Sequence, residues 1–498
     1  MIENLKSAIA QLIHRNKSIK QLNQIYSHVT TSPILSSRDR SFLLSRLFLS
    51  ICTLTHSPSL CYANKIFNRT PNPTIYMYNA MIRANATKTR HPDSCECFVL
   101  YKQMVGNGLV PDCVTFPFVL KECWRRFDLV AGRSLHDHLV KFGYETNVFV
   151  QNGLIRLYSE CRVLEDAWKV FDEMSNRDVV SWNSIIAGYL RSGNLDSALG
   201  LFRRMNQRKN IITWNSVITG LVQCGRAKEA LGFFHEMQVS ENENNAVKPD
   251  KVTVASAISA CASLGAIDQG KWMHSYLKRR GMECDLVMGT ALVDMYGKCG
   301  FVEKAFQVFD GMKNKDVLSW TAMISAFALH GNGSKAFELF EQMEMAGVKP
   351  NAVTYVSALS ACSHSGLVEK GRWYFDRMTR VHHIMPLLEH YACMISMFGR
   401  AGLFNEAEQF IRSMPIEPDI FIWGSLLGAC QQHGNVTLGV KIAQRLIELE
   451  PHNHAFYIVL CDLYSKSERF DDQKRIRGLM EGQEIKKSVP GSSFMNFQ

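Results

Sequence analysis

Two glycine-rich segments of this 498-residue sequence come close to a phosphate-binding loop. Residues 265–271 (GAIDQGK) fit the pattern G-x-x-x-x-G-K-[ST] up to its last position, where Trp272 replaces the hydroxyl residue that would bind Mg²⁺. Residues 366–372 (GLVEKGR) repeat the same spacing further along the chain. Because the pattern returns in phase with a longer repeat, we interpret both segments as structural and not as nucleotide sites.

The sequence does not support a metal site either. A zinc deaminase needs H-x-E together with C-x-x-C, and neither spacing occurs in the sequence. His136 and His274 could be metal ligands, but they share one position of the repeat, so we expect structural roles. The sequence therefore predicts no catalytic residue, no metal site, no cofactor and no enzymatic activity.

The cysteines favour free thiols, because fifteen is an odd number and no secretory-type signal precedes them. Several recur at fixed places in the repeat, which predicts that they serve as small apolar residues in helix packing. They are Cys123, Cys261, Cys362 and Cys430 at the eleventh position, and Cys161, Cys224 and Cys299 at the fourteenth.

The elements that carry these residues are repeats. VSWNS at 180–184 returns as ITWNS at 212–216 and as LSWTA at 318–322, and each is followed by an aromatic-x-x-Met element. Self-similarity with a period in the thirties is typical of stacked repeats, in which each unit buries its apolar face against its neighbours. The aromatic-x-x-Met pairs include Tyr101/Met104, Phe171/Met174, Phe202/Met205, Phe234/Met237, Phe309/Met312, Phe340/Met343 and Phe375/Met378.

Ten contiguous units, 31 to 40 residues long, span residues 75–419. Each has apolar residues at helical spacing on both sides of a Gly near position fifteen, which predicts helix A, a tight turn and helix B. Residues 41–74 resemble one more, weaker unit, and residues 420–498 keep the hairpin pattern with another consensus. The units start at Ile75, Cys113, Val148, Val179, Ile211, Lys251, Leu286, Val317, Ala352 and Leu388.

Charge and hydropathy limit the partners. A formal charge of +10 favours a polyanionic partner, and no apolar run is long enough to cross a bilayer, so we expect no membrane contact. Residues 1–40 are basic and moderately amphipathic, which predicts an organelle-targeting segment that merges into a degenerate repeat. We expect import into the mitochondrion, with the chloroplast as the alternative.

The repeats, such as VVSWNSIIAGYLRSGNLDSALGLFRRM, resemble plant pentatricopeptide repeats of the class that mixes repeat lengths. Residues 420–498, which include IWGSLLGACQQHGNVTLGVKIAQRLIELEP and KKSVPGSSF, are similar to the extension motifs that follow the repeats in organellar RNA-editing specificity factors. The resemblance implies an all-α, right-handed superhelical solenoid whose A helices line an inner groove. It also implies that single-stranded organellar RNA lies in that groove.

In that family, the fifth and last residues of each unit together read one base. The resemblance therefore implies an RNA-binding set. It leaves out the units of the long type, which start at Cys113, Lys251 and Ala352 and carry Pro117, Ala255 and Val356 at position five. Helix capping is the alternative explanation of the polar residues. The set is Asn79 with Asp112, Asn152 with Asp178, Asn183 with Asn210, Asn215 with Asp250, Thr290 with Asp316, and Thr321 with Asn351.

The second residue of each unit is expected to flank a base as an apolar wall, except Glu389. The implied target is 5′-U-n-U-C-U-n-G-A-n-n-n-n-n-C, with the final C edited. Since no deaminase motif is present, the editing partner is expected to be a deaminase-bearing protein recruited in trans through residues 420–498. The alternatives are an organellar RNA stability, splicing or translation factor, and a protein–protein scaffold.

Overall fold

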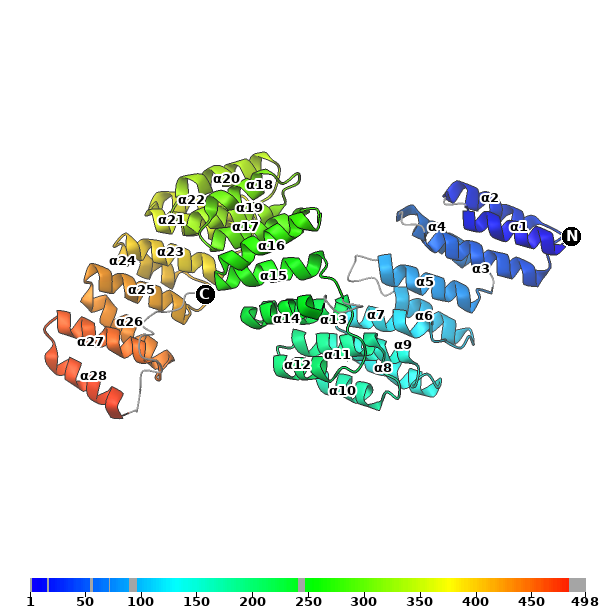
Figure 1. Ribbon diagram of the computed structural model, residues 1–498, viewed down its shortest axis with the longest axis horizontal. Coiled ribbons are helices and arrows are strands. Elements are labelled where there is room, and N and C mark those ends of the chain that lie inside the picture. The colour runs from blue at the N-terminus through cyan, green and yellow to red at the C-terminus, as the bar shows by residue number, and fades with distance from the viewer. Residues whose placement is uncertain are drawn as a thin grey trace. The chain divides into compact units, whose positions relative to one another are not determined.

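The computed structural model describes residues 2–15, 18–53, 57–70, 72–88, 96–240 and 247–482. Within these ranges the chain forms 28 α-helices and no strand (Figure 1). The chain divides into two compact units, residues 1–253 and residues 254–498. No helix in the described ranges is long and apolar enough to cross a membrane.

In the first unit the helices are α1 (Ile2–Arg15), α2 (Ile19–Thr31), α3 (Ser37–Thr53), α4 (Ser57–Arg69), α5 (Ile75–Lys88), α6 (Glu96–Gly106), α7 (Thr115–Arg126), α8 (Leu129–Lys141), α9 (Val148–Glu160), α10 (Leu164–Glu173), α11 (Val179–Arg191), α12 (Leu195–Arg204), α13 (Ile211–Gln223) and α14 (Ala227–Ser240). Helix α15 (Lys251–Leu264) spans the division. In the second unit they are α16 (Ile267–Arg279), α17 (Leu286–Lys298), α18 (Val302–Asp310), α19 (Val317–Leu329), α20 (Gly333–Met345), α21 (Ala352–Ser365), α22 (Val368–Arg380), α23 (Leu388–Arg400), α24 (Phe404–Arg412), α25 (Ile420–His433), α26 (Val436–Leu449), α27 (His454–Lys466) and α28 (Phe470–Gly482).

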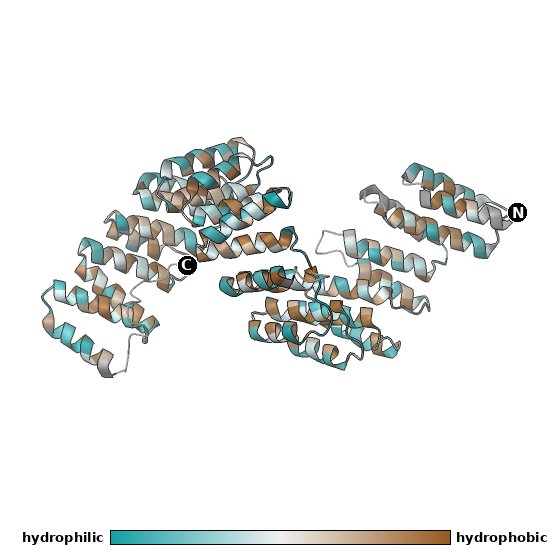
Figure 2. Cartoon of the chain, in the orientation of Figure 1, coloured by the Kyte–Doolittle hydropathy of each residue, from teal (hydrophilic) through white to brown (hydrophobic). Residues whose placement is uncertain are grey.

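Consecutive helices pair into antiparallel hairpins, and the hairpins stack. In the first unit each A helix from α3 to α11 contacts the next A helix, up to α13, and in the second unit each A helix from α17 to α23 contacts the next, up to α25. Apolar and polar residues alternate around each helix, as Figure 2 shows. The predicted all-α solenoid of helical hairpins is therefore confirmed.

The recurring aromatic residues pack consecutive hairpins against one another. In five consecutive-repeat pairs, the aromatic residue of aromatic-x-x-Met in helix B packs against the aromatic residue at the fourth position of the next A helix, with ring centroids 4.9 to 5.6 Å apart. These contacts explain why the two motifs recur together. The pairs are Phe171–Trp182, Phe202–Trp214, Phe309–Trp320, Phe340–Tyr355 and Phe375–Tyr391.

In seven repeats the turn inside the hairpin has the left-handed backbone that its Gly predicted. Gly193, for example, has φ 76°, and Gly225, Gly265, Gly300, Gly331, Gly366 and Gly402 are also positive. Two repeats place other residues there, Phe127 at φ 55° and Arg162 at φ 60°, in a conformation that L-residues seldom adopt.

Nine of the ten starts assigned to the units coincide with the first residue of a helix. Helix α7 begins two residues after Cys113, in the unit that carries Pro117 in its first turn. The weaker unit at residues 41–74 corresponds to α3 and α4, and α25 to α28 continue the stack beyond residue 419. The segment KKSVPGSSF, on which part of the editing-factor resemblance depends, lies outside the described residues.

The two segments that nearly match a phosphate-binding loop, residues 265–271 and 366–372, have a role in helix packing. A side chain at Gly270 would meet the thioether of Met295, and one at Gly371 would meet that of Met397, so both glycines allow close helix contact. Of the cysteines, the four at position eleven are buried as expected. The packing role expected for position fourteen is wrong for Cys224, which is exposed, because that position is the helix C-cap; Cys161 and Cys299 are half-buried there.

Candidate nucleic-acid interface

The last residue of each predicted pair caps the A helix of the following repeat. Its side-chain oxygen accepts a hydrogen bond from the backbone N–H of the third residue in that repeat, at 2.8 to 3.0 Å, for Asp112, Asp178, Asn210, Asp250, Asp316 and Asn351. A cap of this kind stabilises a helix by about 1 kcal/mol. The capping explanation of these residues is therefore a structural fact.

Four of the six predicted pairs are also in direct contact. The amide of Asn79 donates to both carboxylate oxygens of Asp112 at 3.0 and 3.1 Å, and Asn215 donates to both oxygens of Asp250 at 3.1 Å. Asn152 donates to Asp178 at 3.2 Å, and Asn183 donates to Asn210 at 3.3 Å. Each bond joins two residues that are 26 to 35 positions apart and belong to consecutive hairpins.

The hydroxyl at the third position completes a three-residue network. Thr115 donates to the amide oxygen of Asn79 at 2.7 Å, and Thr213 does the same to Asn183. In the junction after Asn152, the Ser181 hydroxyl donates to Asp178 at 2.8 Å instead. Within the described ranges the Oδ1 atom of Asn152 is then buried without a hydrogen-bond partner.

The two predicted pairs that begin with Thr are arranged differently. The Thr290 hydroxyl donates to the Leu286 carbonyl one turn back at 2.8 Å. The Thr321 hydroxyl shares a 2.7 Å hydrogen bond with Thr354, whose hydroxyl donates to Asn351 at 2.9 Å. Thr321 and Asn351 are thus joined through a third residue.

Several side chains of these hydrogen-bond networks are buried, and two of their carboxyl groups have lowered pKa values. The side chains of Asn79, Asn152, Asn183 and Thr321 are buried. Partial burial alone would raise the pKa of Asp178, but hydrogen bonds from Ser181 and Asn152 outweigh it and lower that pKa. The pKa of Asp250 is lowered by the same balance, with donors from Thr253 and Asn215. Both groups are therefore carboxylates at neutral pH.

A row of exposed apolar side chains lies beside these networks. The second residue of the repeat is one helical turn before the fifth, on the same face of the A helix, and in nine repeats its side chain is 49% to 73% exposed. The row in the first unit is Tyr76, Val114, Phe149, Val180, Ile212 and Val252, and in the second unit it is Val287, Leu318 and Val353. Flat or branched apolar side chains at this spacing can hold planar rings between them.

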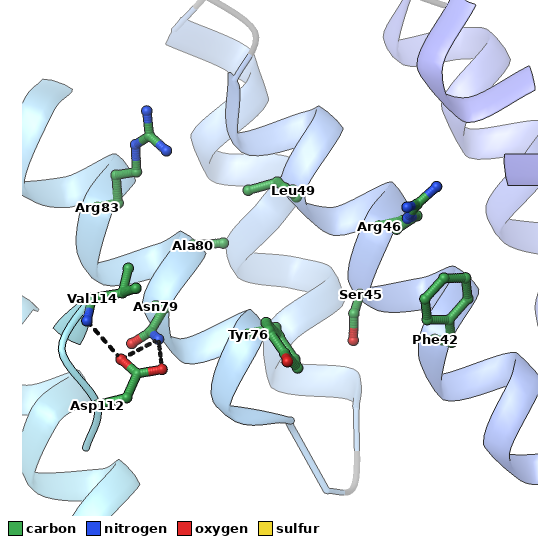
Figure 3. Close-up of a pocket in the computed structure, with 10 residues that line it drawn as sticks. All are labelled: Phe42, Ser45, Arg46, Leu49, Tyr76, Asn79, Ala80, Arg83, Asp112 and Val114. Carbon is green, nitrogen blue, oxygen red and sulfur yellow. Dashed lines mark hydrogen bonds between the residues drawn. The ribbon is translucent and has the colours of Figure 1, made fainter. Parts of the chain in front are cut away.

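A cavity in the first unit combines these features (Figure 3). Its volume is about 500 Å³, and its lining includes Asn79 and Asp112 together with Tyr76, Val114 and Arg83. In the close-up, Asn79 lies between Val114 and Tyr76, and Asp112 lies below Asn79 and is hydrogen-bonded to it. The cavity therefore offers two apolar walls and a polar floor.

Two cations of this face are not among the residues predicted from the sequence. Arg83 and Arg156 stand at position nine, one turn after position five, and both are exposed. The guanidinium of Arg156 lies 4.3 Å from the centre of the Trp124 ring, and that of Arg83 lies 5.7 Å from the Phe118 ring. The alignment of position nine across units could have revealed them, because Arg83, Lys121 and Arg156 occupy it in three consecutive repeats.

The repeat that starts at Leu388 departs from the pattern. Its cap position is Leu387, and its third residue is the fully buried His390. The Nδ1 atom of His390 accepts from the Leu387 N–H at 3.0 Å, and Nε2 pairs with the Ala352 carbonyl at 2.9 Å. Burial lowers the pKa of His390, which keeps the ring neutral in this arrangement.

Other side chains that could be reactive or bind a metal have structural roles. His136 and His274 each bond a Tyr hydroxyl, that of Tyr158 at 2.8 Å and that of Tyr296 at 2.9 Å. Burial raises the pKa of Cys123 to about 12, which keeps this thiol protonated and poorly reactive. In the part of the chain that the structure describes, no group of three His, Cys, Asp or Glu residues is placed to hold a metal ion.

Stacked helical hairpins with recurring polar junctions and a row of exposed apolar residues define a helical-repeat solenoid protein. Models of the PPR repeat family match residues 177–210, 209–263 and 315–364, and models of the PPR repeat match residues 152–179, 290–317, 353–382 and 389–417. A model of the E motif matches residues 433–496.

Relatives extend the match to nearly the whole chain. Pentatricopeptide repeat-containing protein At5g56310 of Arabidopsis thaliana is 39% identical over 481 residues, which cover 97% of this chain and 89% of that protein. The chloroplastic protein CRR2 of the same plant is 37% identical over 486 residues, covering 97% and 67%. This chain belongs to the pentatricopeptide repeat family and carries an E motif.

A solved structure agrees with the fold. The crystal structure of the pentatricopeptide repeat protein PPR10 from maize matches with a TM-score of 0.54 at 17% identity, over 97% of this chain and 80% of that one. At this level of identity the likeness supports the superhelical repeat fold and does not identify a ligand.

Proposed function

We propose that this protein binds a single-stranded organellar transcript along its A helices and selects one cytidine for conversion to uridine. Each repeat would place one base between two second-position side chains, against the fifth and last residues. The supporting observation is that the hydrogen-bonded Asn79 and Asp112 line one cavity together with Tyr76 and Val114. Maize PPR10 has itself been crystallised with an 18-nt RNA element.

The hydrogen-bond networks leave capacity for a base. An Asn amide has two N–H groups and an oxygen with two lone pairs, and a carboxylate accepts several hydrogen bonds. In the first junction, one N–H group of Asn79 and one lone pair of its oxygen suffice for the bonds to Asp112 and Thr115. The remaining capacity can address a Watson–Crick edge, while the network fixes the direction of the amide.

The same proposal assigns residues 420–498 to the recruitment of a separate deaminase. Apolar side chains remain exposed on this segment, among them Phe421 on α25, Ile458 on α27, and Phe470 and Leu479 on α28. The protein itself would act as an adaptor without catalytic residues. Because a relative is described as chloroplastic, an organelle is the expected compartment, and we propose the mitochondrion on the basis of the basic first forty residues.

The deciding experiment is sequencing of organellar transcripts in a plant that lacks the protein. Loss of one C-to-U conversion, restored by the full chain, is the expected result. The double variant Phe470→Ser with Leu479→Ser should bind RNA normally and fail to restore editing. If transcripts change in abundance or splicing while every C-to-U conversion persists, the protein is an RNA-processing factor of another kind.

A further inference from the structure

A second cavity lies next to the one that holds Asn79 and Asp112. Its volume is about 540 Å³, and Phe42, Ser45, Thr74 and Tyr76 line it together with Arg38. Arg38, Phe42 and Ser45 belong to α3, Thr74 directly precedes α5, and Tyr76 lies in its first turn. Figure 3 shows Ser45 between Tyr76 and Phe42, just as Asn79 lies between Val114 and Tyr76.

The lining residues occupy the same repeat positions as those of the neighbouring cavity. Counted from Ser41, Phe42 is the second residue, Ser45 the fifth and Thr74 the last. The Ser45 and Thr74 hydroxyls are 3.0 Å apart and share a hydrogen bond, as the Asn79 amide does with Asp112. The Thr74 hydroxyl also accepts a hydrogen bond from the Met77 N–H at 3.4 Å. This bond corresponds to the one that Asp112 accepts from the Thr115 N–H, by which Asp112 caps the following A helix.

We infer that residues 41–74 form an additional nucleotide-binding repeat, which extends the RNA site by one nucleotide at its 5′ end. This inference rests on the proposed function. The base would stack between the rings of Phe42 and Tyr76, both exposed. The Ser45 and Thr74 hydroxyls would bond its edge, each as donor or acceptor, so the site should discriminate weakly between bases.

Charge favours a nucleotide over an apolar peptide in this cavity. Arg38 lines it and is exposed, and the Arg46 guanidinium lies 5.1 Å from the centre of the Phe42 ring. Two cations beside an aromatic wall suit a base with its phosphate. The cavity is also continuous in sequence and position with the row of sites that we propose for the rest of the transcript, because Phe42, Ser45 and Tyr76 line both cavities.

Three synthetic RNAs test the inference on the full chain. The first ends 5′ at the nucleotide assigned to the repeat that starts at Ile75, the second has one more nucleotide, and the third has an abasic residue there. A stacked base contributes on the order of 1 to 3 kcal/mol. We therefore expect the second RNA to bind at least about fivefold more tightly than the abasic RNA.

The variant Phe42→Ala should remove this difference, which is measured as the ratio of the two affinities because Phe42 also lines the cavity that holds Asn79 and Asp112. Val130→Ala, an exposed apolar residue on the B helix α8, is the matched control and should preserve the difference. Equal binding of all three RNAs would overturn the inference and leave the proposed function intact. Failure of every RNA to bind would overturn the proposed function itself.

A second variant tests the same cavity while keeping the Phe42 ring in place. Ser45→Asn with Thr74→Asp introduces the residue pair of the next repeat, Asn79 with Asp112. This protein should acquire a preference for U at the added 5′ nucleotide, measured with four RNAs that differ only there. An unchanged base preference in a folded variant would overturn the assignment of both positions.

Discussion

Asn79 and Asp112 are 33 residues apart in the chain, and the amide of the first donates to both carboxylate oxygens of the second. The same carboxylate caps the A helix of the following repeat through the Thr115 N–H. One residue therefore holds two hairpins together and orients a polar group toward the cavity. Structural and recognition roles coincide in this junction, so a useful variant must separate them.

Asp112→Ala should lower both stability and RNA affinity. Loss of the cap costs about 1 kcal/mol of unfolding free energy, and loss of the Asn79 partner frees the amide to rotate. Asp128→Ala is the matched control, because Asp128 caps the B helix α8 through the Ala131 N–H at 3.0 Å and lies in no proposed base site. Chemical denaturation and RNA titration of both variants check this. Equal losses of RNA affinity would mean that Asp112 acts through stability alone.

Thr321→Asn with Asn351→Asp should change the base preferred by one repeat from A towards U. In the native protein the Thr321 hydroxyl bonds Thr354, whereas an amide and a carboxylate at these two positions would reproduce the junction of Asn79. A mismatch should cost on the order of 1 to 3 kcal/mol. Binding to RNAs that vary only at the eighth position measures the change, and RNAs that vary at the fifth position provide the control. A persistent preference for A in a folded variant contradicts the proposed register.

His390 should make stability sensitive to mild acid. Burial lowers its folded pKa below the ordinary value of 6.5, so the neutral ring stabilises the protein fully above about 6.5, and this contribution is lost as the pH falls through the folded pKa. Protonation of Nδ1 would break the bond from the Leu387 N–H. One proton changes the unfolding free energy by at most about 1.4 kcal/mol per pH unit.

The comparison for His390 is the variant His390→Thr, which introduces the residue type found at this position in Thr115 and Thr354. His136, His274 and His364 also have lowered pKa values through burial, so the native protein and the variant share their contribution. The difference between the two denaturation curves should therefore depend on pH only below about 6.5. A difference that is constant from pH 5 to 8 would refute the assignment.

RNA affinity should fall as salt rises, and Arg83 and Arg156 should contribute to that slope. Each phosphate contact on a single strand contributes a log–log slope of about 0.7, so Arg83→Gln and Arg156→Gln should each reduce the slope by about that amount. Arg133→Gln on α8 is the control, because its side chain pairs with Asp166 at 3.0 Å on the B-helix side. Unchanged slopes in both groove variants would mean that these two arginines do not contact phosphates.

The sequence alone determined the hairpins of this protein. Helical periodicity, a Gly at the turn and the recurring aromatic-x-x-Met are local signals, since a helix and its caps depend on residues within a few positions of one another. The helix starts at Val179, Ile211 and Val317, and the left-handed turn at Gly193, follow from such signals. Even the two members of the aromatic contacts, such as Phe171 and Trp182, are only 11 to 16 residues apart in the chain.

Only the tertiary structure decided how the polar residues of different repeats meet. Whether Asn79 reaches Asp112, Thr321 reaches Thr354, or Ser45 reaches Thr74 depends on how one hairpin stacks on the next. A pattern of residue types does not show which donors and acceptors pair when several lie within reach of one another. Stacking brings residues more than twenty-five positions apart within about 3 Å, and at that distance a single shift of the helices changes every partner.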